Sequence, residues 1–591
     1  MNRNTSSRTQ IIAWLALPSM LATVAAPQAA VAPGVAAAAV CDHAGLTLPS
    51  GFCATVFADN LGHARHLAVA DDGVVYVNTW DSDYYTGAVH PGGFLIALKD
   101  SKGAGIADSV RRFGPTHESG AHGGTGIAVF DGYLYAEIDD RIVRYQLPAG
   151  GGVPKGAAET VVSKLPRGGD HPMHPFVIDA DGQMYIDIGT ATNSCQAKNR
   201  TRHAQGIRPC VELETRGGIW RYEARRTGQV FSKAGRYATG IRNAVGLALA
   251  PDGHSVYVTQ HGRDQLRNNW PEFYTAEEEA TQPAEELLRL QPGGDYGWPE
   301  CYFDVVQRKL VLAPEFGGDG GRAVGVCAEK LAPVAYFSAH WAPDALLMYR
   351  APQFPARYRD GIFIAFHGSW DRAPYPQGGY NVVFQPLIDG KASEGCEIFA
   401  DGFAGPRVDP QHAQQRPAGL AVGPDGALYV ADDVHGRVYR ISYTPGTEAA
   451  SGPGAGARQC PAPDAPAGPI AGQPSVADAA ASADAPVPPG ATAAMVTLGA
   501  SVFRGEVSGA GCTGCHGTDG GGTSLGPTLG PHKWLWSDGG YAGIRQTIAA
   551  GVPAPKKYRS PMPAMGGAEL SDDEVAAVAA YVWTLSHRKA R

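Results

Sequence analysis

Five stretches of the chain repeat one pattern, in which a short apolar segment leads through an Asp-Gly turn into a β-rich segment. They are HLAVADDGVVYVNT from His66, GIAVFDGYLYAEI from Gly126, FVIDADGQMYIDIG from Phe176, GLALAPDGHSVYVTQHG from Gly246 and GLAVGPDGALYVADD from Gly419. Asp-Gly between alternating apolar residues is a strong signal for a β-hairpin. GIFIAFHGSW from Gly361 is interpreted as a sixth, divergent copy.

Repetition of six hairpin-centred units predicts a ring of small sheets. The fold class we expect is therefore mainly β, a six-bladed β-propeller followed by a small all-α domain. Many Gly (77) and Pro (45) residues and few long helical runs agree with this expectation. The units are unevenly spaced, so insertions lie on loops, where a propeller builds its site near the central axis. A pair of β-sandwiches is the alternative.

A change of composition divides the chain, whose 591 residues exceed what one hydrophobic core usually supports. Residues 444–495 are rich in Ala, Pro, Gly and Ser and carry too few apolar side chains to fold, which predicts a linker. The segments we expect are an N-terminal leader over 1–39, a propeller over 40–443, the linker over 444–495 and a second domain over 496–591.

The leader has the pattern of a secretory signal peptide followed by an Ala-rich stretch. Two arginines precede an apolar run from Ile11 to Ala26, and small residues follow it. The run is short and is followed by Pro27 and Pro33, which disfavours a transmembrane helix. Cys41 lies too far from the run to suit a lipid anchor. We expect a periplasmic or secreted protein with no transmembrane segment after cleavage.

Eight of the ten cysteines lie outside the C-terminal motif described below, and an even number in an exported chain favours disulfides. The sequence leaves their connectivity open. Pairs that are close in the sequence are the simplest, and we expect Cys195 to pair with Cys210 and Cys301 with Cys327. None of the eight forms a C-x-x-C pair, which disfavours a metal site.

The pentapeptide CTGCH at 512–516 has the C-x-x-C-H spacing that attaches a c-type haem. In such a site two thiols bind the haem vinyl groups and the adjacent imidazole takes one axial position on the iron. Cys512 and Cys515 are therefore the predicted attachment residues, and His516 is the predicted iron ligand.

The second axial ligand is predicted to be Met562, which lies between two prolines and can present its thioether to the iron. Met565 is the alternative. A helix over 571–585 is predicted by a capping box, Ser571 with Glu574, and by an apolar face that follows it. The segment resembles the class I cytochromes c along its length, which implies one covalent haem c and electron transfer.

Three runs in the propeller region carry a second resemblance: GIRNAVGLA from Gly240, QHGRD from Gln260 and GGDYGWP from Gly293. Together with shorter phrases between Leu48 and Tyr443, they resemble the soluble quinoprotein sugar dehydrogenases, and more closely the sorbosone and pyranose dehydrogenase-like branch. The resemblance implies pyrroloquinoline quinone (PQQ) lying flat over the propeller centre, with its three carboxylates and its quinone oxygens met by Arg, Lys or Asn.

The resemblance also implies which residues contact that cofactor. They are Arg242, Asn243, Arg65, Arg416, His367 and Trp370. Arg242 and Asn243 match the pair at the quinone oxygens, where Arg stabilises charge as the ring accepts hydride. Arg65 and Arg416 are expected to hold cofactor carboxylates, and Trp370 or His367 to stack on or bind the ring. A salt-bridged blade turn is the alternative interpretation of Arg242 and Asn243.

The general base of the resembled family is a histidine at the start of the third blade. Counting back from the Asp-Gly turn favours His171, with His174 as the rival base or a substrate contact. A neutral imidazole accepts a hydroxyl proton near pH 7, so histidine suits this task. His117 and His122, in the Gly-rich loop before the second blade, are interpreted as solvated and receive no role.

The expected protein oxidises an aldose, pyranose or sorbosone-like sugar with PQQ and passes electrons through haem c to an external acceptor such as a cytochrome or respiratory oxidase. The resemblance adds Ca²⁺, held by the backbone carbonyls of Gly262 and Arg263. A net charge of −8 without a basic block argues against a nucleic-acid partner. The alternatives are a calcium-dependent propeller lactonase or hydrolase, and a non-catalytic sugar-binding propeller that presents a cytochrome.

Overall fold

A computed structural model describes residues 41, 43–81, 91–393, 395–445, 458–468, 485–523, 525–558 and 561–588. The predicted leader over 1–39 and two parts of the predicted linker, 446–457 and 469–484, lie outside these residues. Within the described part of the chain, no helix is long and apolar enough to cross a membrane.

Six four-stranded antiparallel blades form the larger domain, which confirms the predicted propeller. The first three are β2(Ala64–Val69), β3(Val75–Thr79), β4(Gly93–Lys99) and β5(Ser109–Thr116); β6(Ile127–Phe130), β7(Tyr133–Ile138), β8(Arg141–Gln146) and β9(Glu159–Ser163), with β13(Gln229–Val230) added; and β10(Phe176–Ile178), β11(Gln183–Ile188), β12(Gly218–Glu223) and β14(Arg236–Thr239). Each blade continues the ring begun by the one before it.

The remaining blades follow the same order. They are β15(Leu247–Leu249), β16(Val256–Gln260), β17(Glu285–Arg289) and β20(Ala335–Phe337); β21(Pro343–Met348), β22(Gly361–Phe366), β23(Asn381–Ile388) and β25(Glu397–Ala400), with β24(Lys391–Ala392) and β29(Arg458–Gln459) added; and β26(Pro417–Val422), β27(Leu428–Asp432), β28(Val438–Tyr443) and β1(Phe52–Ala58). A β18(Cys301–Asp304) and β19(Lys309–Leu312) hairpin and the short helices α1(Leu266–Asn269) and α2(Ala276–Thr281) lie in insertions.

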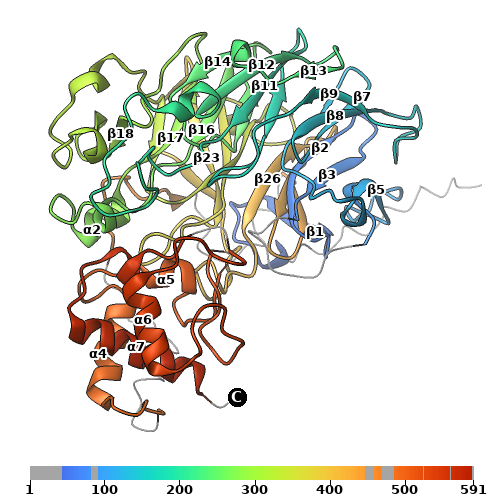
Figure 1. Cartoon of the computed structure of the whole chain (residues 1–591). Coiled ribbons are helices and arrows are strands. Elements are labelled where there is room, and N and C mark those ends of the chain that lie inside the picture. The colour runs from blue at the N-terminus through green and yellow to red at the C-terminus, as the bar shows by residue number, and fades with distance from the viewer. Residues whose placement is uncertain are drawn as a thin grey trace, which may run out of the picture. The chain divides into compact units, whose positions relative to one another are not determined.

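The N-terminal strand closes the ring. β1 supplies the outer strand of the sixth blade by pairing antiparallel with β28, in a register that sets Phe52 opposite Tyr443. The inner strands β2 and β26 then lie side by side, blue against gold in Figure 1. The segment that leads into the first blade is thus fixed to the last blade by backbone hydrogen bonds.

The repeated Asp-Gly phrases form the hairpins that were predicted from them. Asp131 and Gly132, with φ of 51° and 76°, make the two-residue turn between β6 and β7, where only residues tolerant of positive φ fit. Five of the phrases are the first two strands of a blade. The sixth, from Gly361, is instead the second strand of its blade, because β21 precedes it and is joined to it by the longer loop 349–360 and not by a two-residue Asp-Gly turn.

Four disulfides tie the propeller together. The two predicted pairs, Cys195–Cys210 and Cys301–Cys327, are confirmed, and Cys41–Cys53 and Cys396–Cys460 join them. The last pair and the adjacent strand β29 attach residues 458–460 of the predicted linker to the fifth blade.

The C-terminal domain is helical, as predicted. Its helices are α4(Ala493–Phe503), α5(Cys512–His516), α6(Tyr541–Ala550) and α7(Asp572–Ser586), of which α4 and α6 pack against α7 (Figure 1). The predicted capping box is present: Ser571 accepts a hydrogen bond from the backbone of Glu574, whose side chain accepts from the backbone of Ser571. Buried Val578, Val582 and Leu585 fill the core on the predicted face.

Candidate functional site

The candidate site lies at one edge of the blades. Neighbouring strands are antiparallel, so the start of each inner strand and the end of the next strand lie at the same edge. Propeller residues that line a cavity at this edge are Arg65, Trp80, His171, Arg200, Arg242, Asn243, His261, Gly262, Asp344, His367, Trp370, Arg416 and Asp433. The cavity wall therefore contains every predicted quinone contact and the predicted base. Of the predicted propeller site residues, only Arg263 is not part of this wall.

His171 precedes β10 and is buried, with 8% of its surface exposed. Its Nδ1 lies 3.0 Å from the carbonyl oxygen of Thr190, to which it donates, and the Nε2 atom has no hydrogen-bond partner within the described chain. Burial, reinforced by the positive charges of Arg242 and Arg200, holds the pKa of His171 well below its ordinary value. The result is a neutral imidazole whose basic nitrogen is available to a molecule in the cavity.

His174, the rival base, is fully buried and engaged at both ring nitrogens. Nδ1 lies 3.0 Å from Oε1 of Glu137, and Nε2 lies 2.9 Å from the carbonyl oxygen of Pro166. Both partners are acceptors, so both nitrogens donate and no lone pair remains. Burial raises the pKa of Glu137, but the hydrogen bond and charge of His174 outweigh it and the pKa is lowered. This geometry suits a structural ion pair and not a base.

Arg242 is held by an acceptor at each of its three side-chain nitrogens. Its Nε donates to the carbonyl oxygen of Asn193 at 3.0 Å, one Nη donates to Asp264 at 2.8 Å, and the other donates to the carbonyl oxygen of Gly262 at 3.0 Å. The guanidinium is thereby fixed in one orientation. Beside it, the side-chain oxygen of Asn243 is buried and has no hydrogen-bond partner among the described residues. A bound polar molecule would satisfy that atom.

Arg65 and His367 share two buried aspartates. Arg65 contacts Asp433 at 2.5 Å and Asp344 at 2.8 Å, and Nε2 of His367 lies 2.8 Å from Asp433. Burial raises the pKa of Asp433, but the opposing effect of His367 and Arg65 is larger. The pKa is therefore lowered, and the carboxylate of Asp433 is ionised. Much of the positive charge of Arg65 is compensated here, which leaves this side chain less able to hold a cofactor carboxylate than its position predicted.

Arg416 keeps more of its hydrogen-bonding capacity. It donates from Nε to the carbonyl oxygen of His367 at 3.0 Å and from Nη2 to that of Gly368 at 2.8 Å, while Nη1 has no partner within the described residues. Within the described part of the chain, no carboxylate forms an ion pair with its guanidinium. Nearby, the guanidinium of Arg200 lies 5.9 Å from the ring centre of Trp370, another aromatic surface of the cavity.

The predicted calcium ligands fit a cation less well. The carbonyl oxygen of Gly262 already accepts from Arg242, and a guanidinium at 3.0 Å repels a cation. The Arg263 side chain is buried in an ion pair with Glu315. A calcium ion at this turn would have to share or displace the contact made by Arg242.

The predicted haem residues surround an apolar pocket in the C-terminal domain. Cys512, Cys515, His516 and Met562 line it, together with apolar side chains from α4, α6 and α7. Nδ1 of His516 lies 2.9 Å from the carbonyl oxygen of Pro527 and donates to it, which leaves Nε2 for a metal. Burial lowers the pKa of His516 and keeps its imidazole neutral. These features fit a covalent haem.

Met562 is positioned by its own backbone. Its N–H donates to the carbonyl oxygen of Val552 at 3.0 Å, and Val552 donates back at 2.8 Å, so the methionine is fixed at the pocket wall. Met565 does not line the haem pocket. The geometry favours Met562 as the second axial ligand.

Residues 46–444 match the model of the TrAA12-like family. The chain belongs to this family. Residues 496–586 match the cytochrome c model, so the TrAA12-like propeller is followed by a cytochrome c domain.

Solved structures share the fold of the TrAA12-like propeller. The carbohydrate-active enzyme of family AA12 from Trichoderma reesei, in its calcium structure, has a TM-score of 0.54 at 16% identity over 68% of this chain and 98% of its own. The holo PQQ domain of pyranose dehydrogenase from Coprinopsis cinerea has a TM-score of 0.50 at 18% identity over 67% of this chain and 97% of its own.

Curated relatives match part of the TrAA12-like chain. The aldose sugar dehydrogenase YliI of Escherichia coli (strain K12) is 23% identical over 288 residues, 48% of this chain and 63% of its own length. An uncharacterised protein of Borreliella burgdorferi (strain ATCC 35210 / DSM 4680 / CIP 102532 / B31) is 27% identical over 215 residues, 35% of this chain and 48% of its own. The chain thus spans less than two thirds of either relative.

Sequence analysis of the TrAA12-like chain missed the acidic half of its site. Asp433 directly follows β27 at the end of the last Asp-Gly phrase, and Asp264 ends the run QHGRD. An acidic residue after a predicted strand is a signal that could have identified both as site residues. Arg200 lies in the insertion closed by Cys195–Cys210, where no repeat or motif marks it.

Proposed function

We propose that this chain is a quinohaemoprotein dehydrogenase that oxidises an aldose, pyranose or sorbosone-like sugar with PQQ and passes the electrons to haem c. The observation that carries the proposal is His171, a neutral imidazole whose free Nε2 belongs to a cavity lined by arginines in a TrAA12-like propeller. The cytochrome c domain on the same chain supports a redox reaction over a hydrolytic one. The names of the relatives support the sugar and the quinone.

The cavity wall suits a flat, anionic cofactor. Among the described residues, Nη1 of Arg416 and the amide oxygen of Asn243 have no hydrogen-bond partner, and Trp370 offers a ring face. When bound, PQQ supplies an acceptor for a hydride. Arg242 is fixed in advance by Asp264 and Asn193, so it would stabilise negative charge near it without first having to reorient.

The proposed base is His171. Its Nδ1–H donates to the carbonyl of Thr190, which fixes the tautomer and leaves Nε2 as the acceptor. Nε2 takes the proton of the sugar hydroxyl while the hydrogen on the same carbon leaves with its electron pair as hydride. The product is a lactone, acid or keto sugar, depending on which hydroxyl or hydrated aldehyde reacts.

Calcium at the carbonyls of Gly262 and Arg263 stays a proposal, and the contact between Gly262 and Arg242 weighs against it. The cavity also holds the carboxylates of Asp264 and Glu285, which are hard oxygen ligands of the type that Ca²⁺ prefers. If calcium organises the site, a chelator added before the quinone will lower the amount of PQQ bound, and added Ca²⁺ will restore it.

We propose a single haem c, attached at Cys512 and Cys515 and ligated by His516 and Met562. One haem accepts one electron at a time, so each oxidised sugar requires two successive transfers and a reoxidation between them. The final acceptor is then a protein outside this chain, a cytochrome or a respiratory oxidase. Disulfides agree with an extracytoplasmic location, and we propose the periplasm or the medium.

The test is to add PQQ, Ca²⁺ and a panel of sugars to the full-length haem-loaded protein and to follow the haem absorption. We expect an aldose, pyranose or sorbosone-like sugar to reduce the haem only when PQQ is present. Hydrolysis of lactones without haem reduction would instead support the hydrolase. Sugar binding without either reaction would support a non-catalytic binding propeller.

Arg416→Gln should weaken PQQ binding about tenfold to hundredfold, because a hydrogen bond from a charged donor is worth about 1.5–3 kcal/mol. Equilibrium dialysis of PQQ against the full-length protein measures this change. Arg225→Gln is the matched control, since Arg225 lies on the surface in an ion pair with Asp131. Equal affinity of the Arg416 variant and the wild type would remove this arginine from the cofactor site.

A further inference from the structure

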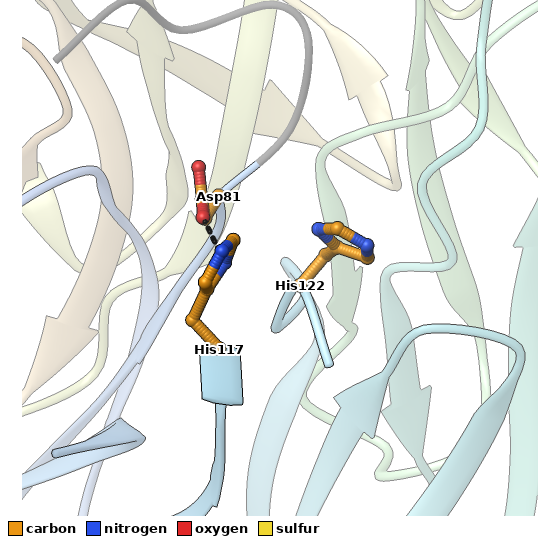
Figure 2. A group of neighbouring side chains, drawn as sticks. All are labelled: Asp81, His117 and His122. Carbon is orange, nitrogen blue, oxygen red and sulfur yellow. Dashed lines mark ion pairs between the residues drawn. The ribbon is translucent and has the colours of Figure 1, made fainter. Parts of the chain in front are cut away.

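A group of potential metal ligands lies where a loop of the first blade meets the connection from that blade to the second. Asp81 follows β3, while His117 and His122 belong to the loop that follows β5. One ligand atom of each residue lies within 4.8 Å of the other two, and Nδ1 of His117 is 2.9 Å from Oδ2 of Asp81. Figure 2 shows His117 directed at Asp81, with the ring of His122 beside them.

Hydrogen bonds from backbone N–H groups fix the two loops that carry these side chains. The Asp81 N–H donates to the carbonyl oxygen of His122 at 2.7 Å, and the His122 N–H donates to the carboxylate of Asp139 at 2.9 Å. The one-turn helix η2(His117–Ser119) begins with a capping box from Thr116. The two histidines are thus brought to the aspartate by the fold itself, so the order required of a metal site is already present.

We propose that Asp81, His117 and His122 bind one divalent transition-metal cation of the Zn²⁺ type. Two imidazoles and one carboxylate are a common ligand set for zinc, whereas Ca²⁺ and Mg²⁺ prefer oxygen ligands alone. Ligand atoms of a tetrahedral zinc site lie about 3.3 Å apart, so small side-chain rotations would complete the set. The imidazole of His122 has no hydrogen-bond partner among the described residues, which leaves it able to turn.

This site is distinct from the proposed quinone and haem sites. None of its three residues is a proposed cofactor contact. None lines the cavity that contains the proposed quinone contacts, here called the hub cavity, although the neighbouring Trp80 does. β3 and β5 both end at the edge of the blades where the hub cavity lies, so the cation would be bound at the same edge. The side chain of His117 is 47% exposed, and the fourth ligand position is therefore open to water or to a small anion.

The test measures Zn²⁺ bound to the full-length haem-loaded protein without PQQ, by equilibrium dialysis and metal analysis after chelator treatment. His117→Ala and His122→Ala should each weaken one Zn²⁺ equivalent by about tenfold or more, since the loss of even supporting contacts costs a metal site about 10- to 100-fold in affinity. Asp81→Asn should act in the same direction. His254→Ala is the matched control, because His254 forms a surface pair with Asp181.

The proposal would be overturned if the His117 and His122 variants bound as much Zn²⁺ as the wild type. It would also be overturned if the His254 control lost as much Zn²⁺ binding as they do. The far-ultraviolet circular dichroism of each variant shows whether it has folded. If a variant fails to fold, X-ray absorption of the Zn²⁺-loaded wild type decides the question. Two imidazole nitrogens and a carboxylate oxygen in the first coordination sphere support the site, and any other ligand set overturns it.

Discussion

Replacing His171 by alanine is expected to slow sugar-dependent haem reduction by about 100- to 10,000-fold, the usual range for loss of a general base. The hydroxyl proton would then have no acceptor in the position of Nε2. Stopped-flow absorption of the haem, with PQQ bound, measures the rate. Binding of PQQ should change little, because the contribution of His171 is to the proton and not to the carboxylates of the cofactor.

Added imidazole should restore part of the rate in His171→Ala, because the deleted side chain leaves a space of the same shape. His254→Ala, on the surface of the third and fourth blades, should react like the wild type. An alanine variant at 171 that reduces its haem at the wild-type rate would show that another group is the base.

The pH dependence of the rate gives a second test of His171 as the base. Burial and the neighbouring arginines hold the pKa of His171 well below the ordinary value of 6.5, so the imidazole remains a base as the pH falls through 6.5. Loss of activity through protonation of this group should therefore begin only at lower pH. In an Arg200→Gln variant, which removes one of the positive charges, that loss should move to higher pH.

Met562→His is expected to lower the reduction potential of the haem by on the order of 0.1 V, because a thioether ligand favours the reduced iron more than an imidazole does. The thioether-to-iron charge-transfer band should disappear at the same time. A redox titration of the full-length protein followed by haem absorption measures the potential. Electron transfer into the haem should slow, since its driving force is smaller.

Met565→Leu is the control for this experiment, because Met565 packs in the domain core but does not line the haem pocket. It should keep both the potential and the charge-transfer band. If Met565→Leu loses the band and Met562→His keeps it, the ligand assignment is reversed.

The parts of the molecule that are encoded locally were predictable. The Asp-Gly turns specify hairpins because few residues accept positive φ, and CTGCH carries its chemistry in five consecutive residues. β21 escaped prediction because the long loop 349–360, and not a two-residue turn, links it to β22. The closing pair of β1 and β28 joins segments almost 400 residues apart, a register that no local pattern encodes.

The site was predictable to a similar extent. Arg242, Asn243 and His171 came from resemblance, and the structure places all three around one cavity. Their electrostatic setting could not be predicted, because it depends on contacts between blades. Arg65 meets Asp344 and Asp433, which come from the fifth and sixth blades, and only the closed ring brings these charges together.

The anchoring of Cys460 to Cys396 changes where the two functional halves of the chain are tied. After Tyr443 the chain returns to the propeller, where Cys460 is bonded to Cys396 and the Ala467 N–H donates to Glu277, so fewer residues separate the propeller from helix α4 than the end of β28 would suggest. For a flexible tether, the frequency with which its two ends meet falls roughly as the −3/2 power of the tether length. Releasing the Cys396–Cys460 bond would therefore lower the frequency of encounter between the two domains by about twofold. Reduction of one disulfide, remote from both redox centres, would then lower the rate of electron transfer between them.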